Sequence, residues 1–401
     1  MEIFSKKLLM GIGAVKSIDD FSGSTYTTWY VTNDGKLFGS GRNDYGQQGN
    51  GDTNNVLTFT ERATNVKEVV CSNTTTWYVT NDGDLYGCGR NNYGQQGSGD
   101  TNDVLTFTER ATNVKEVVCS NTTTWYVTNE SDLYGCGYNN YGTQGNGNTN
   151  NLLTFTERAT NVKEVVCSNS TTWYIIEDGK LFGCGANNYG QQGNGNTSSG
   201  ITTCTQRATN VKQVVCAPYT TWYVTNDGKL FGCGYGSYGQ QGSGDTSVRI
   251  TTFTQRATNV KEVVCSDNTT WYITNDGDLY GCGNGSYGQQ GSGDTNNVLT
   301  FTKRATNVKE VVCSDNTTWY ITNDGDLYGC GSNAFGGQGS GNTNHIGTFT
   351  KRATNVKEVV CTPYTTWYVT NDGKLFGCGS GRYGEQGSGD TNNVLTFTKR
   401  R

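Results

Sequence analysis

The chain has 401 residues, a formal net charge of −5 at pH 7 and 56 glycines. Its lysines and arginines form no basic run, which argues against binding to a nucleic-acid backbone. The apolar patch Leu8–Met10 is too short for a signal peptide, and no stretch approaches the roughly 18 apolar residues of a membrane span. We therefore expect a cytoplasmic protein, with association to a virion as an open alternative.

Eight tryptophans recur along the chain at spacings of 48 or 49 residues, each within a Thr-Thr-Trp-Tyr stretch. They are Trp29, Trp77, Trp125, Trp173, Trp222, Trp271, Trp319 and Trp367. A fixed period of this size indicates a solenoid, a propeller or an array. The sequence thus predicts a single repeat domain over residues 1–401.

One repeat contains four short runs that read as strands. In chain order they are Val56–Ala63, Val66–Cys71, Thr75–Thr80 and Asp84–Gly89. The last two are joined by Asn-Asp-Gly at 81–83, a strong hairpin signal. No segment keeps a 3.6-residue period, so we expect no helix.

The third of these runs is bulky on both faces. Trp77 points to one side, and Tyr78 points to the other. Such a sheet needs a neighbour on each side, which radial stacking supplies. We therefore predict an all-β fold, a closed β-propeller of eight four-stranded antiparallel blades of about 48 residues each, with seven blades as the alternative.

The two ends of the chain resemble parts of a repeat. Val394–Arg401 matches the first run of a repeat, with no second run after it. Phe4–Lys7 and Val15–Ile18 resemble a first and a second run. We expect the C-terminal strand to complete the blade begun at the N-terminus, although this leaves one first strand too many.

The glycine pattern carries a family resemblance over essentially the whole chain. Within Thr75–Asp100, Gly83 marks the turn, Leu85-Tyr86 forms an apolar-aromatic pair, and Gly-Gln-x-Gly-x-Gly spans 94–99. This pattern resembles the repeat of the regulator of chromosome condensation family. The resemblance implies a propeller that binds proteins, usually with seven blades.

The chain departs from that family's pattern at two positions in each typical repeat. The family's histidine is a threonine here, as at Thr75, and its leucine after glutamine is a second glutamine, as at Gln96. The founding member's basic tail and acidic exchange-factor surface have no counterpart that maps onto this chain. The resemblance therefore does not imply nucleotide exchange.

The fifteen cysteines raise the question of disulfides or a metal site. Seven end a second strand, as Cys71 does, and seven lie in Gly-Cys-Gly, as Cys88 does, while Cys204 is extra. Two strand spacings, about 9–10 Å, separate the first two classes within a blade, so no intrablade pair should reach. We expect free thiols in a reducing compartment and no metal.

The sequence offers little catalytic machinery. His345 is the one histidine and lies in a connecting loop. The glycine-rich stretches lack the lysine and helix of a phosphate loop. Calcium at the Asn-Asp-Gly turns is an alternative, although the turn itself needs those residues. We expect no enzymatic activity, no catalytic residues and no cofactor.

Differences between the repeats fall on one side of the predicted propeller. The Asn-Asp-Gly turns barely vary, whereas the stretch after the fourth strand and the second-to-third turn vary most. Because strands alternate in direction, these two variable segments share one face. Their Tyr, Asn, Ser, Gly and Arg content resembles that of antibody loops.

We therefore predict a non-enzymatic protein-interaction or scaffold module that binds through this variable face. The predicted partner-binding residues are Arg42, Tyr45, Arg90, Tyr93, Tyr138, Tyr141, Tyr235, Tyr238, Tyr287, Phe335, Arg382 and Tyr383. Packing of these aromatics against the next blade is the competing interpretation. Alternative functions are an exchange-factor-like regulator of a small GTPase and an adhesin that recognises host protein or glycan. Partner identity and oligomeric state stay open.

Overall fold

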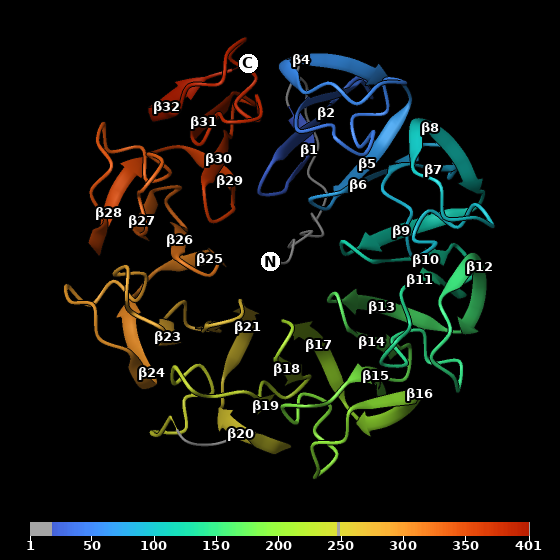
Figure 1. Ribbon diagram of the computed structural model, residues 1–401. Helices are drawn as coiled ribbons and strands as arrows, with labels where there is room; N and C mark the ends of the chain where they lie inside the picture. The colour runs from blue at the N-terminus through green and yellow to red at the C-terminus, as the bar shows by residue number, and fades with distance from the viewer. Residues whose placement is uncertain (1–17, 247–248, 401) are drawn as a thin grey trace.

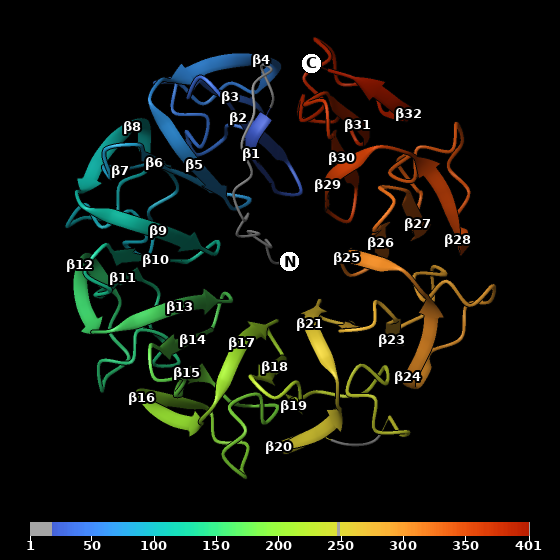
Figure 2. The same cartoon turned by 180° about the vertical axis from the view of Figure 1, so that it is seen from behind.

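The computed structural model describes residues 18–246 and 249–400. These residues form eight four-stranded antiparallel sheets, arranged around a central axis as the blades of a propeller (Figures 1 and 2). The predicted all-β fold with eight blades is confirmed. The described residues contain no helix that could cross a membrane.

Blade 1 comprises β1–β4, blade 2 comprises β5–β8, and so on to blade 8, β29–β32. The innermost strands are β1 Ile18–Gly23, β5 Val66–Cys71, β9 Val114–Cys119, β13 Val162–Cys167, β17 Val211–Cys216, β21 Val260–Cys265, β25 Val308–Cys313 and β29 Val356–Cys361. The second strands are β2 Thr27–Thr32, β6 Thr75–Thr80, β10 Thr123–Thr128, β14 Thr171–Ile176, β18 Thr220–Thr225, β22 Thr269–Thr274, β26 Thr317–Thr322 and β30 Thr365–Thr370.

The third strands carry the Gly-Cys-Gly motif, or Gly-Ser-Gly in blade 1. They are β3 Leu37–Gly41, β7 Leu85–Gly89, β11 Leu133–Gly137, β15 Leu181–Ala186, β19 Leu230–Gly234, β23 Leu279–Gly283, β27 Leu327–Gly331 and β31 Leu375–Gly379. The outermost strands are β4 Val56–Ala63, β8 Val104–Ala111, β12 Leu152–Ala159, β16 Gly200–Ala208, β20 Ile250–Ala257, β24 Val298–Ala305, β28 Ile346–Ala353 and β32 Val394–Lys399.

The predicted blade boundary was wrong by one strand. Val56–Ala63 pairs with β3 of the preceding motif, so it is the outermost strand of blade 1 and not the first strand of blade 2. The turn that follows it leads to the next blade, with Asn65 in the left-handed region at φ 62°. Val66 then donates a backbone hydrogen bond of 2.8 Å to Gly35 O of blade 1.

The predicted exchange of a terminal strand was also wrong. β32 pairs with β31 and completes blade 8, not the blade at the N-terminus. Blade 1 begins with β1 at Ile18, while Phe4–Lys7 and residues 15–17 lie outside the described residues.

The core lies between adjacent blades. Trp29 of blade 1 packs edge-to-face against Phe107 of blade 2, with ring centroids 5.8 Å apart. On blade 2, Tyr78 stacks on Tyr86 at 4.9 Å and meets the edge of the same Phe107. Each sheet thus buries tryptophan against one neighbour and tyrosine against the other, as predicted.

The junction between blades 8 and 1 repeats these contacts. Trp367 packs against Phe59 at 5.9 Å, and Gly389 N donates to Leu57 O at 2.8 Å. Ser40 Oγ donates to Glu385 O at 3.4 Å, where the equivalent groups of other blades are cysteine thiols. The ring is therefore closed by side-to-side packing of two complete blades.

Candidate functional site: the loop face

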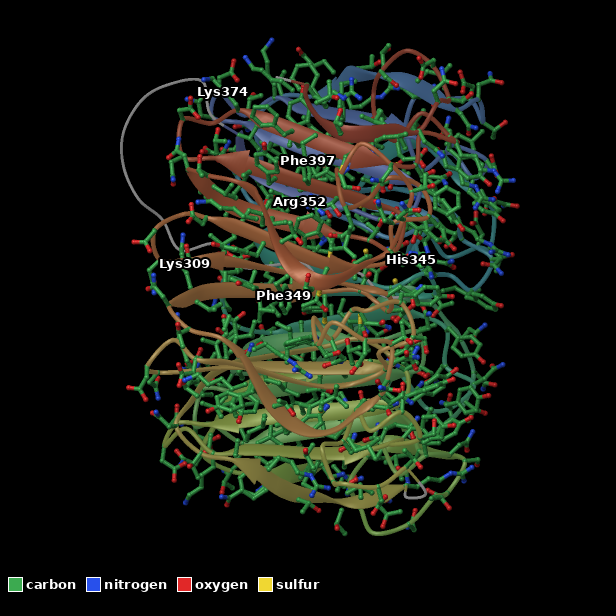
Figure 3. The ribbon with its side chains drawn as sticks, turned by 90° about the vertical axis from the view of Figure 1, so that its left-hand side faces the viewer. Lys309, His345, Phe349, Arg352, Lys374 and Phe397 are labelled. Carbon is green, nitrogen blue, oxygen red and sulfur yellow. The ribbon has the colours of Figure 1, made fainter. Side chains whose placement is uncertain are left out.

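The propeller has two unlike faces. Hydrogen bonds join the Asn-Asp-Gly turns to the turns between blades, as Asn81 N to Asn65 O at 2.9 Å does. We call this side the turn face. The turns after the innermost strands and the long connections after the third strands occupy the opposite side, the loop face. Figure 3 shows Lys309 and Lys374 at the edge of the turn face and His345 on the other side.

Buried amides hold each long connection in shape. In blade 2, Asn91 Nδ2 donates to Ser98 Oγ at 2.8 Å and to Asp100 O, while Asn91 Oδ1 accepts from Gln96 N. Gln96 Nε2 donates to Cys88 O at 2.7 Å. These fully buried groups fix the loop backbone, so the Gln-Gln motif serves the structure of the loop face.

The next blade is linked to the same loop. Gln95 Oε1 accepts from Tyr93 N at 2.8 Å, and its Nε2 donates to Asn121 O of blade 3 at 3.2 Å. The aromatic side chain at the position of Tyr93 is consequently held at the boundary between two blades.

The structure places all the predicted partner-binding residues on the loop face, and several of them contact each other across blade boundaries. The Arg90 guanidinium lies 4.8 Å from the ring centroid of Tyr45. Tyr138 meets the edge of Tyr93 at 5.1 Å. Arg42 lies 5.4 Å from the ring of Tyr383, with Tyr26 packed beside it.

Four large apolar side chains are exposed on the described part of the chain, and all four lie on the loop face. They are Tyr219 at 40%, Tyr238 at 38%, Tyr287 at 39% and Phe335 at 37% exposed. The last three occupy the same loop position in the consecutive blades 5, 6 and 7. We call these four residues the aromatic arc.

Three rings of the arc, those of Tyr238, Tyr287 and Phe335, lie beside small residues of the next blade. Arg90 and Tyr138 directly follow the third strands of their blades and lie beside covered rings. At the same position, blades 6, 7 and 8 have Asn284, Ser332 and Ser380, and these three side chains are buried. They cannot cover the rings of the preceding blades. The diversity after the third strand therefore contributes to the exposure of these three rings.

Several residues of this face were missing from the predicted set. Tyr219 packs against Tyr189 at 4.9 Å, and Arg249 lies 5.0 Å from the ring of Tyr189. Tyr364 meets Phe335 at 4.9 Å, and His345 meets Tyr287 at 5.1 Å. Tyr219 and Tyr364 each follow one of the two prolines, a signal visible in the sequence.

The turns at the inner rim form chains of hydrogen bonds between blades. Asn73 N donates to Asn121 Oδ1 at 3.0 Å, and the next turns repeat the contact. Pro218 and Pro363 have no N–H and interrupt this pattern. Asp267 and Asp315 stand between the two prolines, with Asp267 N donating to Asp315 Oδ1 at 3.3 Å.

This carboxylate pair lies at the wall of a cavity along the axis, together with Ser24, Glu262 and Pro363. Burial, and after it the charge of the neighbouring Asp315, raise the pKa of Asp267 to about 6. Burial also raises the pKa of Asp315. The inner rim next to the arc is thus acidic and partly desolvated.

The thiols are mostly structural. Cys88 Sγ donates to Gln47 O of the previous blade at 3.5 Å, and Cys136 Sγ donates to Gln95 O at 3.4 Å. All fifteen cysteines are free. The prediction that no intrablade pair reaches was wrong, because Cys184 and Cys204 lie 2.7 Å apart. Among the described residues no three His, Cys, Asp or Glu side chains are placed to hold a metal ion.

The fold and its loops define a closed eight-bladed β-propeller with a hydrogen-bonded, glycine-rich loop in each blade. Residues 66–95, 260–289 and 308–336 match the regulator of chromosome condensation (RCC1) repeat. The chain therefore carries RCC1-type repeats, as the sequence predicted. No curated protein sequence matches it.

Solved propellers share the fold. A chain in the crystal structure of Kap60 bound to yeast RCC1 (Prp20) is 16% identical, with 90% of this chain and 94% of that chain covered and a TM-score of 0.64. Prp20p from Saccharomyces cerevisiae is 16% identical over 81% and 87%, with a TM-score of 0.61. Human WBSCR16 is 19% identical over 78% and 88%, with a TM-score of 0.63.

Proposed function

We propose that this propeller is a non-enzymatic protein-interaction module whose loop face binds a partner protein through the aromatic arc. The observation that carries the proposal is the location of the four exposed large apolar side chains, Tyr219, Tyr238, Tyr287 and Phe335, on one face. Binding energy in protein interfaces concentrates in a few aromatic and arginine residues.

The arc is also rigid, which favours binding. The backbone N–H groups of Tyr238 and Tyr287 donate to the side chains of Gln240 and Gln289 at 2.9 and 2.8 Å. A preorganised aromatic loses little conformational entropy when a partner covers it. This arrangement supports recognition by fixed anchors.

The acidic inner rim, which contains Asp267 and Asp315, favours a partner with a positive charge at that place. Asp267 and Asp315 stand on the same blades as the arc, at its axial side. A partner that places an apolar patch on the arc and a lysine or arginine at the rim satisfies both features. We therefore propose a partner with a basic residue beside an apolar patch.

The residues on this face support binding more than catalysis. His345 Nδ1 accepts from Asn333 N at 3.1 Å, and its ring packs on Tyr287, so it holds the loop of blade 7. Burial raises the pKa of the Gly-Cys-Gly thiols well above the usual range, as at Cys88, which disfavours the nucleophilic thiolate.

The test compares two triple variants with the wild type in capture from a lysate of the producing cells. The arc variant is Tyr238→Ser, Tyr287→Ser and Phe335→Ser. The matched control changes the same loop position in other blades, Tyr45→Ser, Tyr93→Ser and Tyr141→Ser. We expect a partner that the wild type and the control capture and that the arc variant loses.

The dissociation constant of the identified partner then gives the size of the effect. The arc variant should weaken binding by about 2 kcal/mol or more, roughly 30-fold. Equal binding by all three proteins, or loss only in the control, would contradict the proposal. If the partner is a small GTPase, release of its bound nucleotide with and without the propeller separates exchange-factor activity from binding alone.

A further inference from the structure

One cysteine, Cys204, occupies a position that phenylalanine holds in the other outermost strands, as Phe107 does in β8. In blade 2 the strand pairing shifts between Gly87 and Gly89, and Cys88 and Phe107 lie next to the paired residues Gly87 and Thr108. In blade 4 the pairing shifts in the same way between Gly183 and Gly185, and Cys184 and Cys204 lie next to the paired residues Gly183 and Thr205. The two Sγ atoms are 2.7 Å apart, with the Cys204 thiol donating to Cys184.

The two cysteines lie on adjacent strands, where neighbouring residues come close enough for a disulfide to span. The blade 3 loop covers the pair, because a Cβ at Gly145 would collide with Cys204 Sγ and lie 3.1 Å from Cys184 Sγ. Cys184 is fully buried, whereas Cys204 is only partly buried.

Charged neighbours act against the effect of burial at Cys184. Burial and the contact with Cys204 raise the pKa of the Cys184 thiol well above its usual range, whereas Arg158 and Arg207 lower it. The guanidinium groups of Arg158, in blade 3, and Arg207, in blade 4, interact electrostatically with both sulfurs. The thiolate is the attacking species in disulfide exchange, and the two cations partly offset the penalty of burial at Cys184. None of the other Gly-Cys-Gly cysteines faces a second cysteine across the strand pair.

We propose that Cys184 and Cys204 are a redox pair that forms a disulfide when the protein meets a small-molecule disulfide such as oxidised glutathione. The Cys204 thiolate attacks one sulfur of the reagent, and one glutathione leaves as a thiol. Cys184 then attacks the Cys204 sulfur of the mixed disulfide, and the second glutathione leaves. Two protein thiols and one reagent disulfide become one protein disulfide and two glutathione thiols, so excess thiol reverses the step.

The crosslink would tie the two ends of the blade 4 loop together. The loop between Cys184 and Cys204 carries Tyr189, which packs against Tyr219 and Tyr235 of blade 5 at 4.9 and 5.1 Å. Oxidation therefore restrains the part of the loop face that borders the aromatic arc. The pair itself is independent of what that face binds.

Mass spectrometry tests the pair directly. Trypsin releases Leu181–Arg207 as one peptide, in which Cys184 and Cys204 are the only cysteines. The full chain is treated with oxidised glutathione, unfolded, alkylated and digested. We expect this peptide to lose two hydrogens and to carry no alkyl group.

The peptide Leu230–Arg249 is the matched control, because it contains only Cys233. It should stay alkylated after the same treatment. Two alkyl groups on Leu181–Arg207, or glutathione retained on Cys204 with Cys184 still alkylated, would show that the two thiols do not pair.

Thermal melting gives a second readout. Closing a loop of this length should raise the melting temperature of the oxidised protein by about 4 °C over the reduced protein. Cys204→Phe, which restores the residue of the other blades, and Cys184→Ser should both melt at the same temperature with and without the oxidant. A redox-dependent shift that persists in either variant would overturn the assignment.

Discussion

The tryptophan of each blade depends on a glycine in the neighbouring strand. In blade 2, a Cβ on Gly87 would lie 2.6 Å from Cε3 of Trp77, well inside van der Waals contact. The same approach recurs in the other blades, as at Gly135 and Trp125. The first glycine of each Gly-Cys-Gly motif is therefore a packing requirement.

We expect Gly87→Ala to lower the free energy of unfolding by about 1–3 kcal/mol, because the buried indole must move. Gly347→Ala is the control. An added Cβ there meets no atom closer than 3.7 Å. Urea denaturation followed by tryptophan fluorescence measures both, and equal stability of the two variants would contradict the packing argument.

Burial of Asp20 predicts how the stability of the folded protein depends on pH. It accepts from Val69 N at 2.6 Å, and burial raises its pKa to about 6. Between about pH 4 and 6 the folded state thus binds more protons than the unfolded state, so this group makes stability fall as pH rises through that window.

Asp20→Asn removes the charge and keeps an acceptor for Val69 N. Gln213 shows that an amide fits, since its Oε1 accepts from Val263 N at 3.1 Å. We expect the variant to be more stable than wild type at pH 7 and to have a shallower fall in melting temperature between pH 4 and 6. A steeper fall in the variant would show that the Asp20 charge is stabilising.

Because side chains alternate along a strand, the sequence predicts on which face of a sheet each residue lies. It assigned Trp77 and Tyr78 to opposite faces, and the structure confirms this. It could not identify the Cys184–Cys204 pair, because that pair depends on which strand lies beside β15. Nor could it separate covered from exposed rings, since each ring's cover comes from the next blade.

At the scale of elements, the strands themselves were predictable and their grouping was not. Val56–Ala63 and Val66–Cys71 are separated by two residues, which reads as a hairpin. The long connection before Val56 reads as a link between blades. In the structure the short turn crosses to the next blade. The long connection stays within its own blade because buried side-chain amides fold it back, as that of Asn43 does by accepting from the backbone N–H of Gln48.

The last strand, β32, is the element whose removal is most informative. Its Phe397 packs against Trp319 at 5.8 Å and Tyr368 at 4.8 Å. Deletion of Val394–Arg401 exposes both rings and the edge of β31. We expect the melting temperature to fall by about 5 °C or more. Truncation after Lys399 keeps β32 and serves as the control, and an unchanged melt of the longer deletion would mean that β32 does not complete blade 8.

At the scale of the whole molecule, the junction of blades 8 and 1 should be as strong as any other. Phe59 contacts Trp367 at 5.9 Å and Tyr30 at 5.0 Å, while Phe107 contacts Trp29 and Tyr78 at 5.8 and 4.9 Å. Phe59→Ala and Phe107→Ala should each cost about 3 kcal/mol. A markedly smaller loss for Phe59→Ala in urea denaturation would mean that the ring opens at this junction.

The two faces of the whole ring should also differ in binding. Asp227 lies in an Asn-Asp-Gly turn of the turn face, where it pairs with Lys229 at 2.8 Å. Asp227→Ser should leave partner affinity unchanged, whereas Tyr235→Ala with Tyr238→Ala should weaken it by about 2 kcal/mol. Titration of the captured partner measures both, and the opposite order would move the binding site to the turn face.

Because every sheet is one uninterrupted stretch of chain, a gain or loss of one repeat in the gene adds or removes one whole blade. Recombination between two copies aligned one repeat out of step would insert or remove 48 or 49 residues. Wherever the exchange falls, the product again consists of whole sheets with a matching partner on each side. Blade number in this architecture can therefore change by single inherited steps, without a half-built sheet at any stage.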